Sequence, residues 1–203
     1  MVNKAKRSGR MSSDRLFLAV AIGREQREQI ERNMEILQRA LTFQKWVQPD
    51  DLHVTLKFLG DTPLDTAEQV KAATRKLAAG HTPFSLSLQG LGTFGRSASP
   101  SILWLGVSGD LTALGELQSQ VEHSVEPFGF TREDGTYSPH VTLARRFQGA
   151  SALLPSALRA AEQAIEPLPA PWTVDRIVLY RSHLHKKPMY EAIDHFDLGS
   201  GNR

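Results

Sequence analysis

The 203-residue chain contains no cysteine, which excludes disulfide bonds, thiolate metal centres and cysteine nucleophiles. It also has no apolar run of about 18 residues, the length that a membrane-spanning helix requires. The N-terminal residues lack the apolar core of a secretory signal. We therefore expect a soluble, cytoplasmic protein without membrane contact.

An excess of charge of one sign is also nearly absent, because 24 lysines and arginines are balanced by 22 acids. This balance does not demand a nucleic-acid partner, although it permits a local basic cleft. The basic residues gather in 1–13 and 181–187. We expect 1–13 and 200–203 to be disordered tails. Residues 14–199 should form one domain, because no linker rich in Pro, Gly or Ser divides them.

The hydrophobic pattern predicts strands and helices in alternation. Strands are predicted at 16–22, 46–47, 53–59, 84–89, 102–107, 140–143, 177–184 and 190–198. Helices are predicted at 24–41, from Pro63 to Gly80, from an Asp110 cap to 125 and, weakly, within 151–166. Turns or loops are predicted at 60–63, 95–101, 129–139 and 90–95, the last because no lysine and helix follow to make it a phosphate-binding loop. The order predicts an α+β fold with mixed or antiparallel sheets and helices packed outside.

The tetrapeptide His-Val-Thr-Leu occurs twice, beginning at His53 and at His140. Alternate side chains of a strand share a face, so each histidine should lie beside the threonine two residues later, Thr55 or Thr142. A neutral imidazole can accept a proton from water, and a protonated one can donate to a leaving oxygen. The hydroxyls can donate hydrogen bonds to phosphate oxygens. The repeat predicts a two-histidine phosphodiester site, although either copy alone would suit an ordinary half-buried strand.

The paired motif and its surroundings resemble the 2H phosphoesterases, and within them the LigT-like RNA 2′,3′-cyclic phosphodiesterases, also called 2′-5′ RNA ligases. The similar stretches, in chain order, are Arg15–Val20, Trp46–Val47, Leu52–Gly60, Leu103–Val107, Pro139–Arg145, Leu179–Ser182 and Tyr190. The resemblance implies a bilobal fold with rough two-fold pseudosymmetry, in which each lobe supplies one motif strand to a central cleft. The chain lacks the glycine that the family often has near Lys187-Pro188.

The resemblance also implies an activity, the hydrolysis of a terminal RNA 2′,3′-cyclic phosphate to a 2′-phosphate without metal or cofactor. The substrates would be RNA ends or small cyclic nucleotides, and the protein would be a monomer. By position, His53 matches the proton donor, His140 the proton acceptor, and Thr55 and Thr142 the phosphate-binding hydroxyls. The alternatives are 2′-5′ ligation in the same site and a non-catalytic nucleotide-binding module.

Five residues after each histidine stand Phe58 and Arg145, which in the family resemble the walls of a nucleobase site. Five is an odd number, so a flat strand would turn both side chains away from the cleft and turn Lys57 and Arg146 toward it. A β-bulge would be needed to reverse this. Core packing of Phe58 and a solvated charge at Arg145 or Arg146 are the alternatives.

Two further histidines, His183 and His185, are expected on one strand face beside Arg181, Lys186 and Lys187. Together with the motif histidines they would make four possible metal ligands. Their spacing is not a zinc signature and no acid flanks them, so we expect no metal site. A basic rim that contacts RNA phosphates and a plain exposed hairpin are the two remaining interpretations.

Overall fold

The computed structural model describes residues 13–199, and its elements follow the predicted alternation. The strands are β1 (Ser13–Ala21), β2 (Phe43–Trp46), β3 (His53–Pro63), β4 (Phe84–Arg96), β5 (Ser99–Gly109), β6 (His140–Phe147), β7 (Trp172–Val174), β8 (Arg176–Ser182) and β9 (Tyr190–Asp197). The helices are α1 (Arg24–Ala40), α2 (Leu64–Ala78), α3 (Leu111–Val125) and α4 (Pro155–Ala164), with short 3₁₀ helices η1 (Pro49–Asp51) and η2 (Glu126–Phe128).

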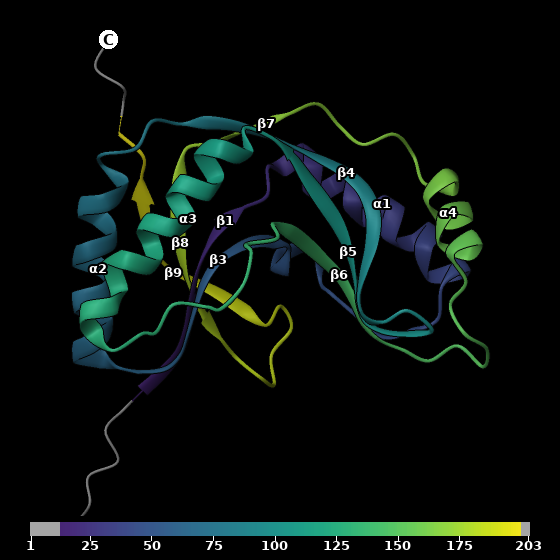
Figure 1. Cartoon of the computed structure of the whole chain (residues 1–203), viewed down its shortest axis with the longest axis horizontal. Coiled ribbons are helices and arrows are strands. Elements are labelled where there is room, and N and C mark those ends of the chain that lie inside the picture. Colours follow the sequence, from purple (N-terminus) through teal and green to yellow (C-terminus); the bar gives the residue numbers. More distant parts are fainter. Residues whose placement is uncertain (1–12, 200–203) are drawn as a thin grey trace, which may run out of the picture.

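The described strands form one curled sheet in which every pairing is antiparallel (Figure 1). Its order is β7-β4-β5-β6-β3-β1-β8-β9, and β2 also pairs with β6. The two motif strands, β3 and β6, are therefore neighbours at the centre, joined by the pair Val54–Val141. A half with β7, β4, β5, β6 and β2 and a half with β3, β1, β8 and β9 meet there, which agrees with the predicted cleft between two lobes.

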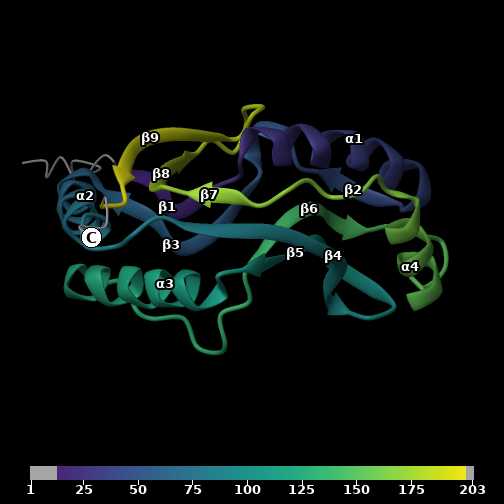
Figure 2. The same cartoon turned by 90° about the horizontal axis from the view of Figure 1, so that it is seen from above.

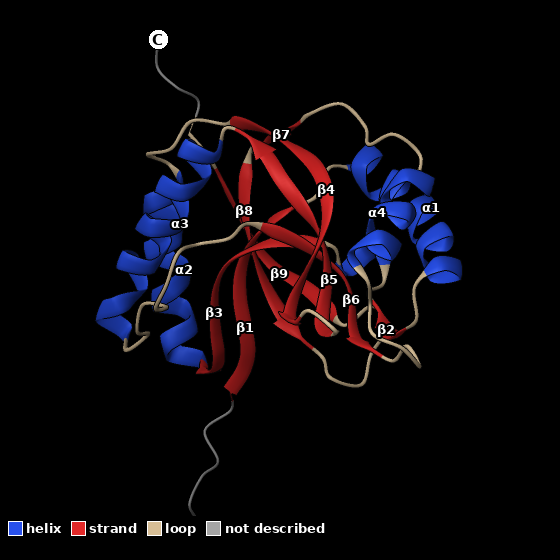
Figure 3. Cartoon of the chain, turned by 45° about the vertical axis from the view of Figure 1, so that its right-hand side comes forward, coloured by secondary structure: helices blue, strands red, loops and turns tan. Residues whose placement is uncertain are grey.

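The helices cover the two ends of this sheet. Helices α2 and α3 lie together at one end, and α1 and α4 at the other (Figures 2 and 3). Helix α3 follows β5 of one half but packs beside β3 of the other half, and α1 follows β1 but packs against α4. Each half is thus covered by one helix of its own and one from the other half, which gives the predicted two-lobed arrangement.

Local sequence signals explain where two of the helices lie. The predicted apolar face of α1 (Ile30, Met34, Leu37) and Leu41, which follows the helix, are all buried, so burial of one stripe stabilises the helix against the sheet. Helix α3 begins after Asp110, whose carboxylate accepts a hydrogen bond of 2.9 Å from the Ala113 N–H. A cap of this kind typically contributes about 1 kcal/mol.

The predicted turn at 60–63 was wrong, because β3 continues through it and pairs with β1 as far as Pro63. Gly60 has a φ of 69° and lies at a register shift between the two strands, so the glycine serves an irregularity in the strand. The Thr62 hydroxyl bonds the Gly60 carbonyl and does not cap α2. Strand β1 begins at Ser13, inside the predicted tail, and the remaining tail residues lie outside the described part of the chain.

The predicted turn at 90–95 was also wrong, because these residues lie inside the long strand β4. A side chain at Gly92 would collide with the Trp104 ring, so this glycine permits a close approach between β4 and β5. The hairpin turn is narrower than predicted, at residues 97–98. Strand β7 was not predicted, because its three residues are too few for a visible period. None of the helices within 13–199 is long and apolar enough to cross a membrane.

Candidate active site

The two motif strands orient their side chains as period-two geometry predicts. The valines and leucines, Val54, Leu56, Val141 and Leu143, are at most 3% exposed, whereas each histidine and threonine is half-buried. Because the strands are antiparallel and Val54 pairs with Val141, the register places Thr142 beside His53 and His140 beside Thr55. All four polar side chains line one cavity of about 300 Å³.

Both imidazoles are held in the same way. His53 Nδ1 lies 2.7 Å from the Asp51 carbonyl oxygen, and His140 Nδ1 lies 2.8 Å from the Ser138 carbonyl oxygen. A carbonyl can only accept a hydrogen bond, so each Nδ1 carries the proton and each Nε2 is left as an acceptor. His53 Nε2 accepts from the Thr55 hydroxyl at 3.1 Å. In each motif, therefore, the carbonyl two residues before the histidine fixes the tautomer.

Aromatic rings surround the two histidines and keep them partly dry. Phe17 and Tyr190 lie 4.8 and 5.3 Å from the His53 ring, and Phe94 lies 4.8 Å from the His140 ring, measured between centroids. Burial lowers the pKa of His53 to about 4, against the opposing effect of the Asp51 carbonyl, and the Arg145 charge adds to the lowering. Burial also lowers the pKa of His140. Both imidazoles are therefore predominantly neutral at pH 7.

A β-bulge in β3 decides which way Lys57 and Phe58 point. Thr55 pairs with Ala19 of β1 and Lys57 with the adjacent Leu18, so one β3 residue, Leu56, has no partner. Side-chain parity reverses at this point. Phe58 is consequently 56% exposed and lines the cavity, whereas Lys57 is 3% exposed and faces the interior. The flat-strand prediction that Lys57 faces the cleft was wrong.

The second motif strand has the equivalent bulge. Thr142 and Ala144 pair with adjacent residues of β5, so Leu143 has no partner and the parity again reverses. Arg145 therefore lines the same cavity as Phe58. Arg146 has a φ of 61°, and its guanidinium Nη1 donates a hydrogen bond to Gln44 Oε1 at 3.4 Å. It is not among the residues that line the cavity. The prediction that Arg146 faces the cleft was also wrong.

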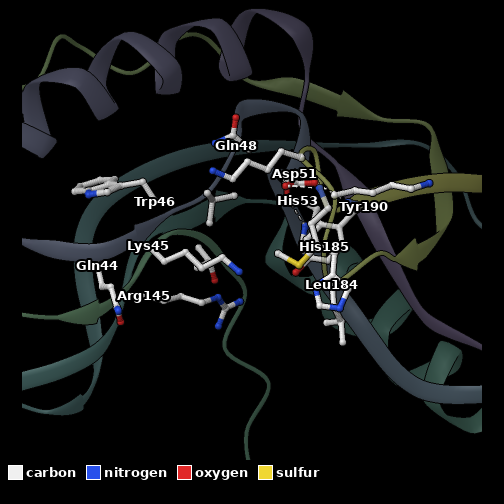
Figure 4. Close-up of a pocket in the computed structure, with 15 residues that line it drawn as sticks. Gln44, Lys45, Trp46, Gln48, Asp51, His53, Arg145, Leu184, His185 and Tyr190 are labelled. Carbon is white, nitrogen blue, oxygen red and sulfur yellow. Dashed lines mark hydrogen bonds between the residues drawn. The ribbon is translucent and has the colours of Figure 1, made fainter.

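The cleft has two compartments that share His53, Thr142 and Arg145. Compartment B is the cavity of about 300 Å³ already described, and its remaining walls are Thr55, Leu56, Phe58, Phe94, Ile102, Glu133, Thr136, Tyr137, Ser138 and His140. Compartment A, of about 290 Å³, lies between β2 and the loop joining β8 to β9 (Figure 4). Its remaining walls are Gln44, Lys45, Trp46, Val47, Gln48, Asp51, Leu184, His185, Lys186, Lys187, Met189 and Tyr190.

Compartment A is electropositive. Lys45, Lys186 and Lys187 join Arg145 around it. Its carboxylate, Asp51, is 5% exposed and accepts hydrogen bonds from two backbone N–H groups at the start of β9, at 2.9 and 2.8 Å. An anion entering this compartment therefore meets four cationic side chains and a carboxylate that is already hydrogen-bonded.

Asp51 is the residue that sequence reasoning missed. Its carbonyl orients His53, and its carboxylate fixes the backbone of Met189 and Tyr190 on the opposite wall. No periodicity marks such a residue, because it lies in η1 just before the strand. The run Pro49-Asp50-Asp51 is a turn signal, and it was the one available indication.

The histidines of the β8–β9 region do not share a strand face, contrary to expectation. His183 Nε2 lies 2.7 Å from Glu191 Oε2, an acid supplied by the neighbouring strand, whereas His185 lines compartment A. Within residues 13–199, no three His, Cys, Asp or Glu side chains converge closely enough to hold a metal ion. Lys186 and Lys187 are exposed on the loop at the rim of the cleft.

Two His-x-Thr strands facing one cleft at the centre of a curled antiparallel sheet form the arrangement that the 2H phosphoesterase resemblance predicted. Residues 24–186 match the family model of the 2′-5′ RNA ligase superfamily. The chain therefore belongs to that superfamily.

Relatives and solved structures agree with this assignment. An RNA 2′,3′-cyclic phosphodiesterase of Geobacillus stearothermophilus is 39% identical over 191 residues, which cover 93% of this chain and 58% of the relative. One of Bacillus subtilis is 32% identical over 158 residues, covering 78% of this chain and 82% of the relative. The crystal structure of the protein TT0787 from Thermus thermophilus superposes with a TM-score of 0.74 at 26% identity, covering 92% of this chain and 99% of that one.

Proposed function

We propose that this protein hydrolyses the 2′,3′-cyclic phosphate at the end of an RNA and leaves a 2′-phosphate. The observation that supports this best is that two fixed imidazoles and two threonine hydroxyls line one cleft. The Geobacillus and Bacillus relatives bear the name RNA 2′,3′-cyclic phosphodiesterase, which favours the same class of reaction here.

The proposed reaction is a single in-line displacement. His140 Nε2 takes a proton from water as the water oxygen bonds to phosphorus. The bond from phosphorus to O3′ breaks, and His53 donates its proton to O3′. Thr55 and Thr142 donate hydrogen bonds to the non-bridging oxygens, where negative charge grows. The division of roles between the histidines follows the family resemblance.

Substrate binding would allow His53 to take up from the solvent the proton that it later donates. A phosphate anion next to an imidazole favours its charged form and raises its pKa. Once Nε2 of His53 is protonated it no longer accepts from the Thr55 hydroxyl, which is 3.1 Å away in the free site. That hydroxyl is then free to donate to the phosphate. Proton uptake and phosphate binding would therefore assist each other.

The two compartments give the substrate its orientation in this proposal. Phe58 would stack on the terminal base in compartment B, with the Arg145 guanidinium as a second planar group. The cations of compartment A would contact backbone phosphates of a longer RNA. A monomeric protein in the cytoplasm stays an expectation from the sequence.

We further propose that the reaction needs no metal, because the imidazoles and hydroxyls can supply both proton transfers and the charge stabilisation. The test is to incubate the protein, in EDTA, with an oligoribonucleotide ending in a 2′,3′-cyclic phosphate. The expected product is heavier by one water and loses its terminal phosphate to a phosphatase. An unchanged substrate in EDTA that reacts after Zn²⁺ or Mn²⁺ is added would contradict metal independence. An unchanged substrate under all conditions would favour the non-catalytic binding module.

Ligation is the second candidate, and the size of compartment A favours it. A volume of about 290 Å³, walled by Trp46 and Tyr190, offers space for a second nucleoside beside the phosphate. Attack by a 5′-hydroxyl in place of water would then join two RNAs through a 2′-5′ linkage. Adding an RNA with a 5′-hydroxyl to the same assay distinguishes the two reactions by the length of the product.

A further inference from the structure

A buried ion pair lies behind the motif strand β3, on the side away from the cleft. Lys57 Nζ is 2.9 Å from Glu122 Oε1 of α3, and the two side chains are 3% and 6% exposed. Burying two charges removes them from water, and the cost can exceed their mutual attraction. Stability alone therefore does not account for this pair.

Both charges of the pair also bind the backbone of the loop that precedes β6. Lys57 Nζ donates to the Thr131 carbonyl at 2.6 Å, and Glu122 Oε1 accepts from the Glu133 N–H at 3.2 Å. Although burial by itself raises the pKa of Glu122, the hydrogen bonds from Lys57 and Glu133 and the charges of Lys57 and Arg132 together hold this pKa below its ordinary value. The carboxylate is therefore ionised at neutral pH, and the pair holds the loop through hydrogen bonds at Thr131 and Glu133.

The far end of the same loop contacts both motifs. The Tyr137 hydroxyl donates to the Thr55 carbonyl at 2.8 Å. The Ser138 carbonyl is the acceptor that holds His140 Nδ1, also at 2.8 Å. The direction of the His140 imidazole thus depends on where this loop places one carbonyl group.

The second motif has no equivalent of this device. Four residues after His140 stands Ala144, where the first motif has Lys57. The carbonyl that orients His53 belongs to Asp51, whose carboxylate is held by the backbone N–H groups of Met189 and Tyr190. The ion pair therefore reaches the carbonyl that orients His140 through this loop, whereas the carbonyl that orients His53 is held at a different place.

We propose that Lys57 and Glu122 are positioning residues for His140. They fix the loop at residues 131–133, so that the Ser138 carbonyl holds the imidazole with Nε2 toward the cleft. The kinetic consequence rests on the proposed phosphodiesterase function. The effect on the ring of His140 follows from the geometry whether or not the protein is that enzyme.

The test replaces both charges together, because removing one would leave the other buried and unpaired. Apolar replacement of a whole buried pair commonly preserves folding, so Lys57→Met with Glu122→Leu should melt close to the parent temperature. We expect kcat on a nucleoside 2′,3′-cyclic phosphate to fall about 10- to 100-fold, because displacement of a catalytic group by about 1 Å has that effect. KM should change less than kcat.

Imidazole ¹⁵N NMR reports the tautomer of each histidine, which would not change if Lys57 and Glu122 only stabilised the fold. In the double variant, His140 should lose its fixed Nδ1–H tautomer while His53 keeps its own, so the first motif serves as an internal control. Lys76→Met is the matched control, because it makes the same change on an exposed position of α2. It should leave kcat, melting temperature and both imidazole spectra at parent values.

The outcomes separate this proposal from the proposed function. A folded double variant with parental kcat and a parental His140 spectrum overturns the positioning role. If the double variant does not fold, Lys57→Gln with Glu122→Gln decides, because it keeps two long polar side chains and removes both charges together. A smaller loss of kcat with an altered His140 spectrum supports the role, and parental values for both overturn it. If the parent itself is inactive, the proposed function fails and the NMR comparison alone decides.

Discussion

The pKa of His53, about 4 in the unliganded site, leads to a prediction about pH that can be tested without any substitution. The pKa of a free histidine is about 6.5, so burial disfavours protonation of His53 by about 3 kcal/mol. At pH 7 only about 0.1% of the free protein would carry a proton on His53. The pKa of His140 also lies below 6.5. If catalysis needs one proton on the two histidines together, kcat/KM should therefore be highest at acidic pH.

The dependence of kcat/KM on pH reports the groups of the free protein. We expect a bell with its maximum between about pH 4 and 6.5, and a fall of at most about 30-fold between pH 6.5 and pH 8, because loss of one proton lowers the rate at most tenfold per pH unit. The profile of kcat should lie at higher pH, because the bound phosphate raises the pKa of the pair. The assay is initial rates on a nucleoside 2′,3′-cyclic phosphate, with an NMR titration of both imidazoles in parallel. A kcat/KM that still rises above pH 7, or a free-state pKa of His53 near 6.5, would refute the reasoning.

The same lowering links pH to stability. The folded pKa of His53 lies below its unfolded value, so the unfolded chain binds the proton more readily. The stability is fully present above about pH 6.5 and is lost as the pH falls toward 4, by at most about 3 kcal/mol from this group. Chemical denaturation of the parent and of His53→Gln at several pH values measures it. An equal acid-induced loss in both proteins would contradict the assignment to His53.

Three sets of substitutions test the rest of the site. His53→Ala and His140→Ala should each lower turnover about 10²- to 10⁴-fold, with the double variant little worse, and near-full turnover in either single variant would exclude the two-histidine mechanism. The double substitution of Lys186 and Lys187 by Gln should reduce the salt dependence of RNA binding and leave mononucleotide turnover unchanged. An unaltered salt dependence would show that these lysines do not contact the RNA backbone. Phe58→Ala should weaken binding of short and long substrates alike by about 1–3 kcal/mol, and a loss of thermal stability without a binding change would show a packing role instead.

The sequence predicted the elements that carry a clear period and a clear chemical signal. Val54 and Val141 face the core and the histidines face the cleft, because alternation alone decides this once the segments are strands. Helix α1 and the Asp110 cap followed from spacing and residue type in the same way. The repeated tetrapeptide was enough to predict that His53 and His140 line one site, because each copy places a histidine and a threonine on the same polar face of its strand.

The parts that failed depend on the partner strand and not on the strand itself. The bulges at Leu56 and Leu143 arise from the register with β1 and β5, so the direction of Phe58 and Arg145 could not be read from their own strands. The segment at Gly60 was predicted as a turn because a glycine with positive φ occurs both in turns and in β-bulges, and the sequence does not distinguish the two. The anchoring role of Asp51 depends on β9, more than 130 residues later in the chain.

The two halves of the sheet meet along β3 and β6, where Val54 and Val141 form the one backbone pair between the described motif strands. By contrast, β3 is paired with β1 along nearly its whole length, and β6 pairs with β5 over five positions. The two halves are thus joined along their shared line by one backbone pair, with one histidine and its threonine on each side. A rotation about this line would change the gap between the two imidazoles and leave each imidazole in place within its own half. The spacing of the two histidines therefore depends on the least paired line of the sheet, and their individual orientations depend on the strands that are paired over many residues.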